Sequence, residues 1–170
     1  MDPRRPKARA GRLMRKWCMP DDAQKPNLGL IFEIFNEVGI IEQLSRALLE
    51  AQLPKGLIAP HFGVISHLSK RPEGSTPIDM ARAFQVPKTS MTHTLQGLEK
   101  HGLVTIGPNP ADGRSKLVVL TEAGHALRNE TYAKLGPDVM KAAAALDLEA
   151  LAAIKPVLQN LREYLDTARD

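Results

Sequence analysis

The fold of this chain is decided by residues 77–121, PIDMARAFQVPKTSMTHTLQGLEKHGLVTIGPNPADGRSKLVVLT. The stretch predicts a helix, a tight turn, a second helix and a hairpin of two strands. Within the second predicted helix, residues 88–101, the apolar residues Met91, Leu95 and Leu98 recur at i, i+4 and i+7, which places them on one helix face. We therefore expect that face to pack into a core and the opposite face to remain at the surface.

The opposite face of this second helix is polar and carries no acid. A solvated surface helix usually mixes Glu with Lys, whereas hydroxyl, imidazole, amide and ammonium groups suit the phosphates and base edges of DNA. Gln96 lies in the middle of the helix, and a Gln side chain can read adenine through two hydrogen bonds. The candidate DNA-contacting residues of this helix are Lys88, Thr89, Ser90, Thr92, His93, Gln96 and Lys100.

The helix before it has clear start and stop signals. Ser75 or Thr76 can cap its N-terminus, and Pro77 fits the first helical position. Pro87 disfavours helical geometry at Val86, so the helix must end just before that residue. Two short helices joined by such a turn form a helix-turn-helix. The inward-facing residues of the first helix are predicted to be Ile78, Ala81 and Phe84.

Two strands follow, over residues 103–106 and 116–121, and the connector GPNPADGRS between them is rich in turn-forming residues. A hairpin attached to a helix-turn-helix is a winged helix. Asp112 and Arg114 lie in the tip of this hairpin, and one interpretation is a local Asp–Arg pair on an exposed loop. The other is that Asp112 steadies the hairpin while Arg114 reaches a DNA minor groove, whose negative potential attracts Arg, and Lys116 contacts phosphate.

The sequence NPADGRSKLVVLTEAG, residues 109–124, resembles the wing and the following helix start of the MarR family of transcriptional regulators. The family pattern, Asp-x-Arg followed by a strand ending in Leu-Thr and then a Gly, is met by Asp112, Arg114, Leu120, Thr121 and Gly124. Residues 59–70, APHFGVISHLSK, are similar to the second helix of the family, and the resemblance covers about residues 53–124. One departure is Pro87, where many relatives place a Ser, Thr or Asp cap, so we expect the second helix of the pair to lack a side-chain N-cap.

This resemblance implies a mainly α fold, with a winged helix-turn-helix DNA-binding core, a two-stranded wing and flanking N- and C-terminal dimerisation helices. It implies a cytoplasmic transcriptional regulator, a homodimeric repressor that binds a pseudo-palindromic operator in double-stranded DNA. The alternative is a winged helix that serves as a protein–protein interaction module without sequence-specific DNA binding. That alternative favours acidic or apolar residues around Thr89, His93 and Gln96, and the sequence has none on that face.

Long apolar helices are predicted on both sides of the winged helix. Residues 28–52 carry apolar side chains over much of the helix circumference. The helix that starts after Thr121 is expected to be interrupted or kinked at residues 136–138, Gly-Pro-Asp, and Asp147 should cap the last helix, which Pro156 should bend. The apolar stripe of that last helix consists of Leu148, Leu151, Ile154, Leu158, Leu161 and Leu165. An exposed stripe of this length would promote aggregation, so we expect it to pair with residues 28–52 in a homodimer interface.

The charge of the 170-residue chain follows four expected segments. These are a basic, mostly flexible tail (1–27, net charge +5), a dimerisation helix (28–53, −3), the winged helix-turn-helix DNA-binding domain (54–121, +4) and C-terminal dimerisation helices (122–170, −2). Positive charge on the tail and the core, with mildly acidic flanks, is expected of a nucleic-acid binder that has a separate non-DNA module. The tail is either a solvated extension or an arm that enters a minor groove.

Several other classes of function are not favoured. The single cysteine, Cys18, rules out an internal disulfide framework, and it lies well before the first clear helix, unlike the sensing cysteine of redox-responsive family members. No apolar run approaches the ~20 residues needed to cross a membrane. The chain has no Gly-rich phosphate loop, HExxH or GxSxG, so we expect neither an enzyme nor a cofactor. His61 and His67 are six residues apart instead of three or four, so we expect no metal site.

The resemblance also implies a small-molecule effector, because MarR-like proteins commonly bind apolar anions between the dimerisation helices and the DNA-binding lobes. Here the crevice would lie between residues 28–52, the second helix and the start of the helix after Thr121, and an aromatic carboxylate or phenol would fit it. The candidate ligand-binding residues are Phe32, Phe35, His61, Phe62 and His67. The alternative is that these side chains simply fill the core.

Overall fold

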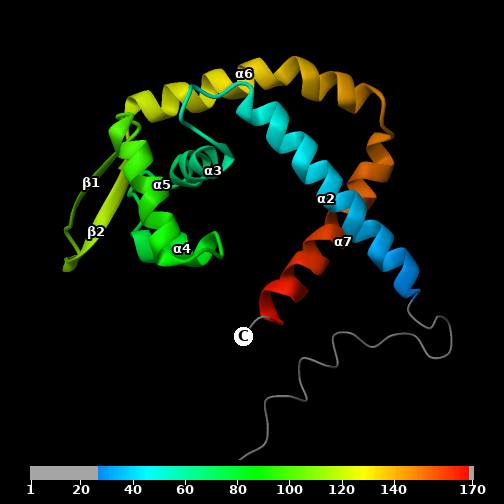
Figure 1. Cartoon of the computed structure of the whole chain (residues 1–170), viewed down its shortest axis with the longest axis horizontal. Coiled ribbons are helices and arrows are strands. Elements are labelled where there is room, and N and C mark those ends of the chain that lie inside the picture. The colour runs from blue at the N-terminus through cyan, green and yellow to red at the C-terminus, as the bar shows by residue number, and fades with distance from the viewer. Residues whose placement is uncertain (1–26, 169–170) are drawn as a thin grey trace, which may run out of the picture. The chain divides into compact units, whose positions relative to one another are not determined.

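The computed structural model describes residues 27–168, so most of the basic tail, with Cys18, lies outside the described residues. The elements in chain order are helices α2 (Leu28–Glu50), α3 (Ala59–Leu68), α4 (Pro77–Ala83) and α5 (Lys88–Lys100), strands β1 (Val104–Asn109) and β2 (Asp112–Leu120), and helices α6 (Glu122–Ala144) and α7 (Leu148–Thr167) (Figure 1). The chain divides after Ile41 into two units, and the second unit holds the winged helix. The predicted fold class, mainly α with a two-stranded wing and flanking helices, is confirmed.

Helices α4 and α5 form the predicted helix-turn-helix. Thr76 caps α4, because its Oγ1 accepts a hydrogen bond from Asp79 N at 3.2 Å and donates one to Asp79 Oδ2 at 2.6 Å. α4 ends at Ala83, and Gln85 takes a left-handed backbone conformation, with φ 55°, in the turn. Pro87 is the N-cap residue of α5 and makes no side-chain cap hydrogen bond, as predicted. The first turn of α5 therefore keeps amide groups that no capping side chain satisfies.

One hydrophobic core lies beneath the helix pair and the wing. The predicted inner stripe of α5 is confirmed, because Met91, Leu95 and Leu98 are at most 2% exposed. The predicted stripe of α4 is partly wrong, because Ile78 is 42% exposed whereas Met80 is fully buried. A helix of seven residues makes only about two turns, so its sequence pattern defines the buried face poorly. The core consists of Leu57, Val64, Ile65, Leu68, Met80, Ala81, Met91, Leu95, Leu98, Leu103, Val104, Val118 and Leu120.

The wing is longer, and its tip shorter, than the sequence predicts. β1 pairs antiparallel with β2, and a register shift follows Pro108. Most of the predicted connector, residues 107–115, belongs to the two strands, which leaves Pro110 and Ala111 as the tip. Pro108 is tolerated because its strand, β1, has a free edge, where a missing N–H breaks no ladder bond.

The wing is tied to the helix pair through Ser75. Ser75 N donates to Val118 O at 3.0 Å, and Val118 N donates back to Ser75 O at 3.0 Å. Gly74 precedes this bridge with φ +86°, and a Cβ there would lie 2.6 Å from Val118 O. Glycine is therefore required at this position, and the bridge fixes β2 beside the start of α4.

The helix after the wing is continuous. α6 has 23 residues and contains Pro137, so the helix is not interrupted at residues 136–138, and the alternative of a kink there stays a prediction. Proline removes one N–H donor, and the hydrogen bonds on either side of it are enough to keep the helix together. Asp147 caps α7 as predicted, because its Oδ1 accepts from Glu149 N at 2.9 Å and Ala150 N at 3.4 Å. Pro156 lies inside α7 without ending it.

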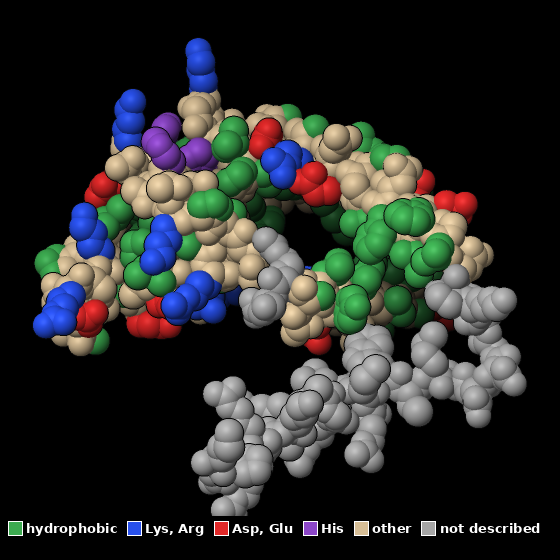
Figure 2. All heavy atoms as spheres, turned by 60° about the horizontal axis from the view of Figure 1, so that its bottom comes forward, with side chains coloured by type: hydrophobic (Ala, Val, Ile, Leu, Met, Phe, Trp, Pro, Cys, Tyr) green, Lys and Arg blue, Asp and Glu red, His purple; other side chains and the backbone are tan. Residues whose placement is uncertain are grey.

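The terminal helices carry apolar side chains that this chain does not bury. Neither α2 nor α7 contains a buried residue. In α7 the exposed fractions of Leu148, Leu151, Ile154, Leu158 and Leu165 range from 40% to 66%. Hydrophobic side chains accordingly gather on the surface of these helices (Figure 2). None of the helices in the described part of the chain is both long and apolar enough to cross a membrane.

Candidate nucleic-acid interface

Helix α5 presents a polar face to solvent above its buried stripe. All seven residues of this helix that the sequence assigns to DNA are exposed. Thr92 Oγ1 donates to Lys88 O at 2.8 Å, so this hydroxyl keeps only its acceptor lone pairs, beside its methyl group, for a ligand. Glu99 is also exposed, and by helical phase it lies between Lys88 and Thr92, so this face of α5 includes one acidic residue. The other residues of the face combine cationic groups with hydrogen-bonding groups.

The tip of the wing is held by local hydrogen bonds. Asp112 Oδ1 accepts from Arg114 N at 3.1 Å, and Asn109 Nδ2 donates to Ser115 Oγ at 2.9 Å. The side chains of Arg114 and Lys116 are exposed, and neither takes part in an ion pair with any described residue. Asp112 therefore supports the backbone of the tip and does not neutralise Arg114. The sequence reasoning missed Asn109, although Asn beside Pro is a common turn signal.

The surface around these elements is rich in basic groups. Lys and Arg side chains project over the wing and the helix pair, with acidic side chains between them (Figure 2). The net charge of residues 54–121 is +4. Such a surface attracts the phosphates of a nucleic acid and makes the binding depend on salt.

Three of the predicted ligand-binding residues lie against three different neighbours. The ring of His61 lies against α5. The ring of Phe62 meets Tyr132 of α6 edge-on, with centroids 5.4 Å apart, and the ring of His67 lies 5.3 Å from that of Phe84 at the end of α4. The structure therefore does not bring these three side chains together around one cavity.

The other two predicted ligand-binding residues are on α2, where Phe32 is 70% and Phe35 is 39% exposed. The two histidines are partly buried, and burial lowers the pKa of both His61 and His67 below the ordinary 6.5. His101 also lowers the pKa of His61, whereas a backbone hydrogen bond at Ile58 raises it, and Arg71 and Lys70 further lower the pKa of His67. Both imidazoles are therefore neutral near pH 7.

A pocket of about 390 Å³ lies between the end of α2, α3, the turn after α4 and α5, and none of the five predicted ligand-binding residues lines it. Its size is within the usual range for small-molecule sites, ~300–1,000 Å³. Most of its wall is apolar, and two hydroxyl groups and one guanidinium supply polar contacts. The lining residues are Arg46, Ala59, Pro60, Gly63, Val64, Phe84, Val86, Ser90, Met91 and Thr94.

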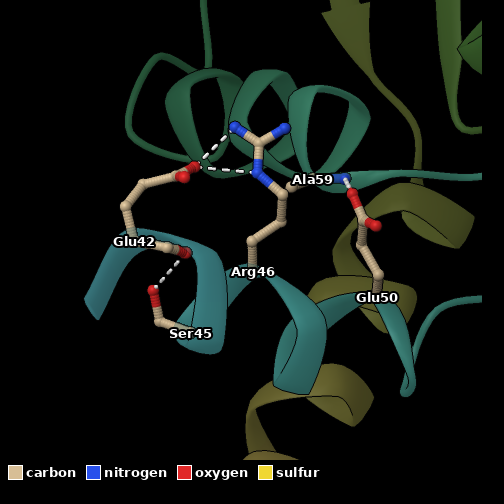
Figure 3. A network of polar contacts seen from close by, with 5 residues as sticks. All are labelled: Glu42, Ser45, Arg46, Glu50 and Ala59. Carbon is tan, nitrogen blue, oxygen red and sulfur yellow. Dashed lines mark hydrogen bonds and ion pairs between the residues drawn. The ribbon is translucent and has the colours of Figure 1, made fainter. Parts of the chain in front are cut away.

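The end of α2 is joined to the start of α3 by a polar network (Figure 3). Arg46 Nε donates to Glu42 Oε1 at 2.8 Å, and its Nη2 donates to the same oxygen at 2.5 Å. Ser45 Oγ donates to Glu42 O at 3.0 Å. One turn further on, Glu50 Oε1 accepts from Ala59 N at 2.8 Å, which satisfies an amide at the N-terminus of α3. The sequence reasoning missed this network, whose signal is the i, i+4 spacing of Glu42 and Arg46.

Comparison with known proteins shows which family and which solved structures this chain resembles. Residues 55–115, which contain the helix pair and most of the wing, match the model of the MarR family. The apo form of wild-type MarR from E. coli is 25% identical to this chain, with a TM-score of 0.62 over 82% of this chain and 98% of that one. A mutant MarR from E. coli, with serine in place of a cysteine, complexed with operator DNA, is 23% identical, with a TM-score of 0.68 over 81% and 99% of the two chains.

CouR from Rhodococcus jostii bound to p-coumaroyl-CoA is similar as well, at 21% identity and a TM-score of 0.66 over 75% of this chain and 90% of that one. These similarities extend beyond the matched residues to the helices on either side of the winged helix. The family match and the shared fold agree with the wing pattern that ends at Gly124. Residues 55–115 of this chain therefore match the MarR family, and the described chain shares the winged-helix fold of these MarR structures.

Proposed function

We propose that the protein is a homodimeric repressor that binds a pseudo-palindromic operator through α5 and the wing of each protomer. The observation that carries this proposal is the exposed face of α5, which offers mainly hydrogen-bonding and cationic groups and lies opposite a buried apolar stripe. The E. coli MarR structure with operator DNA supports it by similarity of fold.

In this proposal α5 lies in the major groove. Gln96 and His93 contact base edges, and Lys88 and Lys100 contact phosphates. The uncapped first turn of α5 adds backbone N–H groups, and helix N-termini favour phosphate. Thr89, Ser90 and Thr92 contribute hydroxyl contacts.

The wing contributes contacts outside the major groove. Arg114 enters the adjacent minor groove and Lys116 contacts phosphate, and both side chains are exposed without a charged partner in the described chain. The Asp112 hydrogen bond to the Arg114 backbone holds the tip in one conformation. Arg114 therefore loses little conformational freedom at the backbone when it binds.

The exposed apolar surfaces of α2 and α7 support the homodimer. Leu44 is 62% and Leu158 is 42% exposed, and a contiguous apolar surface of this kind usually marks a protein interface. A two-fold dimer places two copies of α5 on one side of the duplex. The half-site centres are then about one helical turn, ~10 bp, apart.

Binding-site selection from random duplexes tests this function. We expect a two-fold symmetric site, and Gln96→Ala should weaken binding to it by ~1–3 kcal/mol with a much smaller loss on random DNA. Arg114→Ala should weaken binding to both DNAs and flatten the salt dependence. Lys134→Ala, which removes the same charge from an exposed site on α6, is the matched control. Equal losses for Gln96→Ala on the two DNAs would show that Gln96 contacts only phosphate.

We further propose that a small aromatic carboxylate or phenol releases the operator. The pocket between α3, the turn after α4 and α5 supports this, because it is mainly apolar, has Arg46 at its wall and touches the proposed DNA-contacting helix. The ligand-bound CouR structure gives a precedent for a ligand in a protein of this fold. Arg46→Met should weaken release by a carboxylate more than release by the matching neutral amide. Compounds that raise the melting temperature without changing operator affinity would contradict the coupling.

The competing function is a winged helix that binds another protein. It differs in a simple measurement, because DNA binding through phosphates weakens steeply with salt. A protein that passes through a DNA resin at low salt would exclude the operator-binding function.

A further inference from the structure

Helix α5 comes close to α3 at Gly97, where the ring of His61 lies. A Cβ added at Gly97 would stand 2.6 Å from His61 Nε2 and 3.3 Å from His61 Cδ2. Real Cβ atoms do not approach heavy atoms to 2.6 Å, so the approach of the two helices depends on glycine at this position. Gly97 follows Gln96 in the sequence, so the His61 ring contacts α5 next to the proposed base-contacting residue.

The opposite side of the His61 ring is fixed by a hydrogen bond. His61 Nδ1 lies 3.1 Å from Ile58 N, and Ile58 is the N-cap residue of α3. A backbone N–H can only donate, so Nδ1 accepts and carries no proton. His61 is thus the third residue of α3 and returns a hydrogen bond to the N-cap amide, as Glu or Gln does in a capping box. The neutral ring is therefore held at the start of α3 while its Nε2 edge contacts α5.

A second histidine holds the same glycine from the other side. His101 Nδ1 lies 2.8 Å from Gly97 O, and because a carbonyl only accepts, this Nδ1 is the donor. The Cε1 and Nε2 atoms of His101 would lie 3.5 Å from a Cβ at Gly56, in the loop before α3. Two imidazole rings therefore fix the position of Gly97 relative to the start of α3.

We propose that neutral His61 is a positioning residue that holds the DNA-contacting helix α5 in place against α3. Protonation of His61 breaks this contact between the His61 ring and Gly97 and weakens operator binding. The inference rests on the proposed function, because it concerns the helix that contacts the operator. It goes beyond that function in naming a side chain that touches no DNA and a proton that controls it.

The consequences of protonation follow from the atoms around the ring. A proton on Nδ1 would face the Ile58 N–H, so two donors would oppose each other and the cap would break. The positive charge would also lie at the N-terminus of α3, where the helix dipole disfavours cations. The ionisable groups of the neighbouring elements are Glu50 at the end of α2, Lys55 in the loop, and Glu99, Lys100 and His101 at the end of α5.

Burial, followed by the nearby His101, lowers the pKa of His61 below 6.5. When the pKa of a group is lower in the folded state than in the unfolded state, its contribution to stability is fully present at pH values above the unfolded-state pKa. This contribution is lost as the pH falls through the lower, folded-state pKa. The window for the effect therefore lies on the acid side of pH 6.5.

The experiment compares the wild type with His61→Gln across pH 8 to pH 5. Gln at the third position of a helix can accept from the N-cap amide and does not titrate, so it keeps the cap and removes the proton. Operator affinity is measured by fluorescence anisotropy, and thermal unfolding is measured without DNA. We expect the affinity of the wild type to fall at least about fivefold relative to His61→Gln over the acid part of the range. Its melting temperature should fall relative to the variant in parallel.

His125→Gln is the control, because it removes an exposed histidine on α6 and should leave the pH profile of the wild type unchanged. His93 is present in all three proteins, so its contribution to DNA binding cancels in the ratio. Parallel affinity profiles for the wild type and His61→Gln would overturn the proposal. If the wild type binds no DNA at pH 7.5, the proposed function fails. The melting temperatures of the wild type and His61→Gln without DNA, compared across the pH range, then decide whether protonation of His61 breaks its contact with α5.

A double-mutant cycle tests the same contact if His61→Gln does not fold. Gly97→Ala should weaken operator binding in the wild type, because the new methyl group collides with the His61 ring. In a His61→Ala background the methyl group has room, so the loss from Gly97→Ala should be at least about fivefold smaller. If Gly97→Ala costs the same operator affinity in the two backgrounds, the His61 ring does not hold α5 in place.

Discussion

A single methyl group at Gly124 should destabilise the winged helix, and the size of the effect follows from its neighbours. Gly124 lies in the first turn of α6 and is buried. A Cβ at this position would stand 2.4 Å from Leu103 O and 2.5 Å from Leu120 Cδ1. Ordinary van der Waals contact begins near 3.4 Å, so α6 would have to move by about 1 Å away from the start of the wing.

That movement is opposed by hydrogen bonds at the same junction. Gly124 N donates to Thr121 Oγ1 at 3.1 Å, and Thr121 N donates to Leu103 O at 3.1 Å. Forcing an extra carbon into a packed core costs typically ~1–3 kcal/mol. Ala is favoured over Gly within a helix by ~1 kcal/mol, which offsets part of this. We expect a net loss of up to about 2 kcal/mol for Gly124→Ala.

Thermal unfolding followed by circular dichroism measures this loss. For a domain of this size, ~1 kcal/mol corresponds to a shift of ~2–4 °C in melting temperature. Gly107→Ala, in β1 of the same wing, is the matched control because no atom lies within 4 Å of the added carbon. Its melting temperature should equal that of the wild type or exceed it slightly. A Gly124→Ala protein at least as stable as the wild type would refute the steric argument.

Three further predictions concern the terminal helices and their caps. Sedimentation at micromolar concentration should give twice the chain mass of 18.6 kDa, and Leu158→Glu should give a monomer or an unfolded chain; a folded wild-type monomer would exclude the dimer. Asp147→Ala should lower the unfolding free energy by ~1 kcal/mol, because two amides of α7 lose their acceptor, and an unchanged melting temperature would contradict the cap. Glu50→Ala should lower it by ~1–2 kcal/mol by leaving Ala59 N without its partner, whereas Glu50→Gln keeps an acceptor and should lose less.

The winged helix was predictable from the sequence because its signals are local and agree with one another. The period of Met91, Leu95 and Leu98 fixed the buried face of α5 over more than three helical turns. The caps at Thr76 and Asp147 are chemical signals that need only the next few residues. Such predictions succeed because neighbouring atoms decide them.

The predictions that were wrong or incomplete concern features that depend on contacts between distant parts of the chain. Met80 is buried in place of Ile78 because the core beneath α4 is built by other elements. β2 begins at Asp112, well before the predicted start, because pairing with β1 and hydrogen bonds in the tip extend the strands through residues that favour turns. The pocket beside Arg46 is formed by three helices and has no signature in any one of them.

Thr121 connects the elements of the winged helix through its hydrogen bonds. Thr121 Oγ1 donates to Gly102 O at 2.8 Å and accepts from Gly124 N, while its backbone N donates to Leu103 O. These bonds join the end of α5, both strands of the wing and the start of α6, so these elements move as one body. α3 meets these elements along α5, at the contact between His61 and Gly97 and at the pocket lined by Ser90 and Thr94.

A ligand in the pocket and a proton on His61 would therefore act on the same contact between α3 and α5. Their effects on operator affinity should not add. Once acid has broken the contact between His61 and α5, the ligand should change the operator affinity of the wild type less than it does at neutral pH. The change that the ligand causes in His61→Gln should be independent of pH. Titration of operator affinity against ligand at pH 7.5 and pH 5.5, in the wild type and in His61→Gln, measures this coupling. Equal ligand responses of the wild type at the two pH values would show that the two signals reach the operator by separate routes.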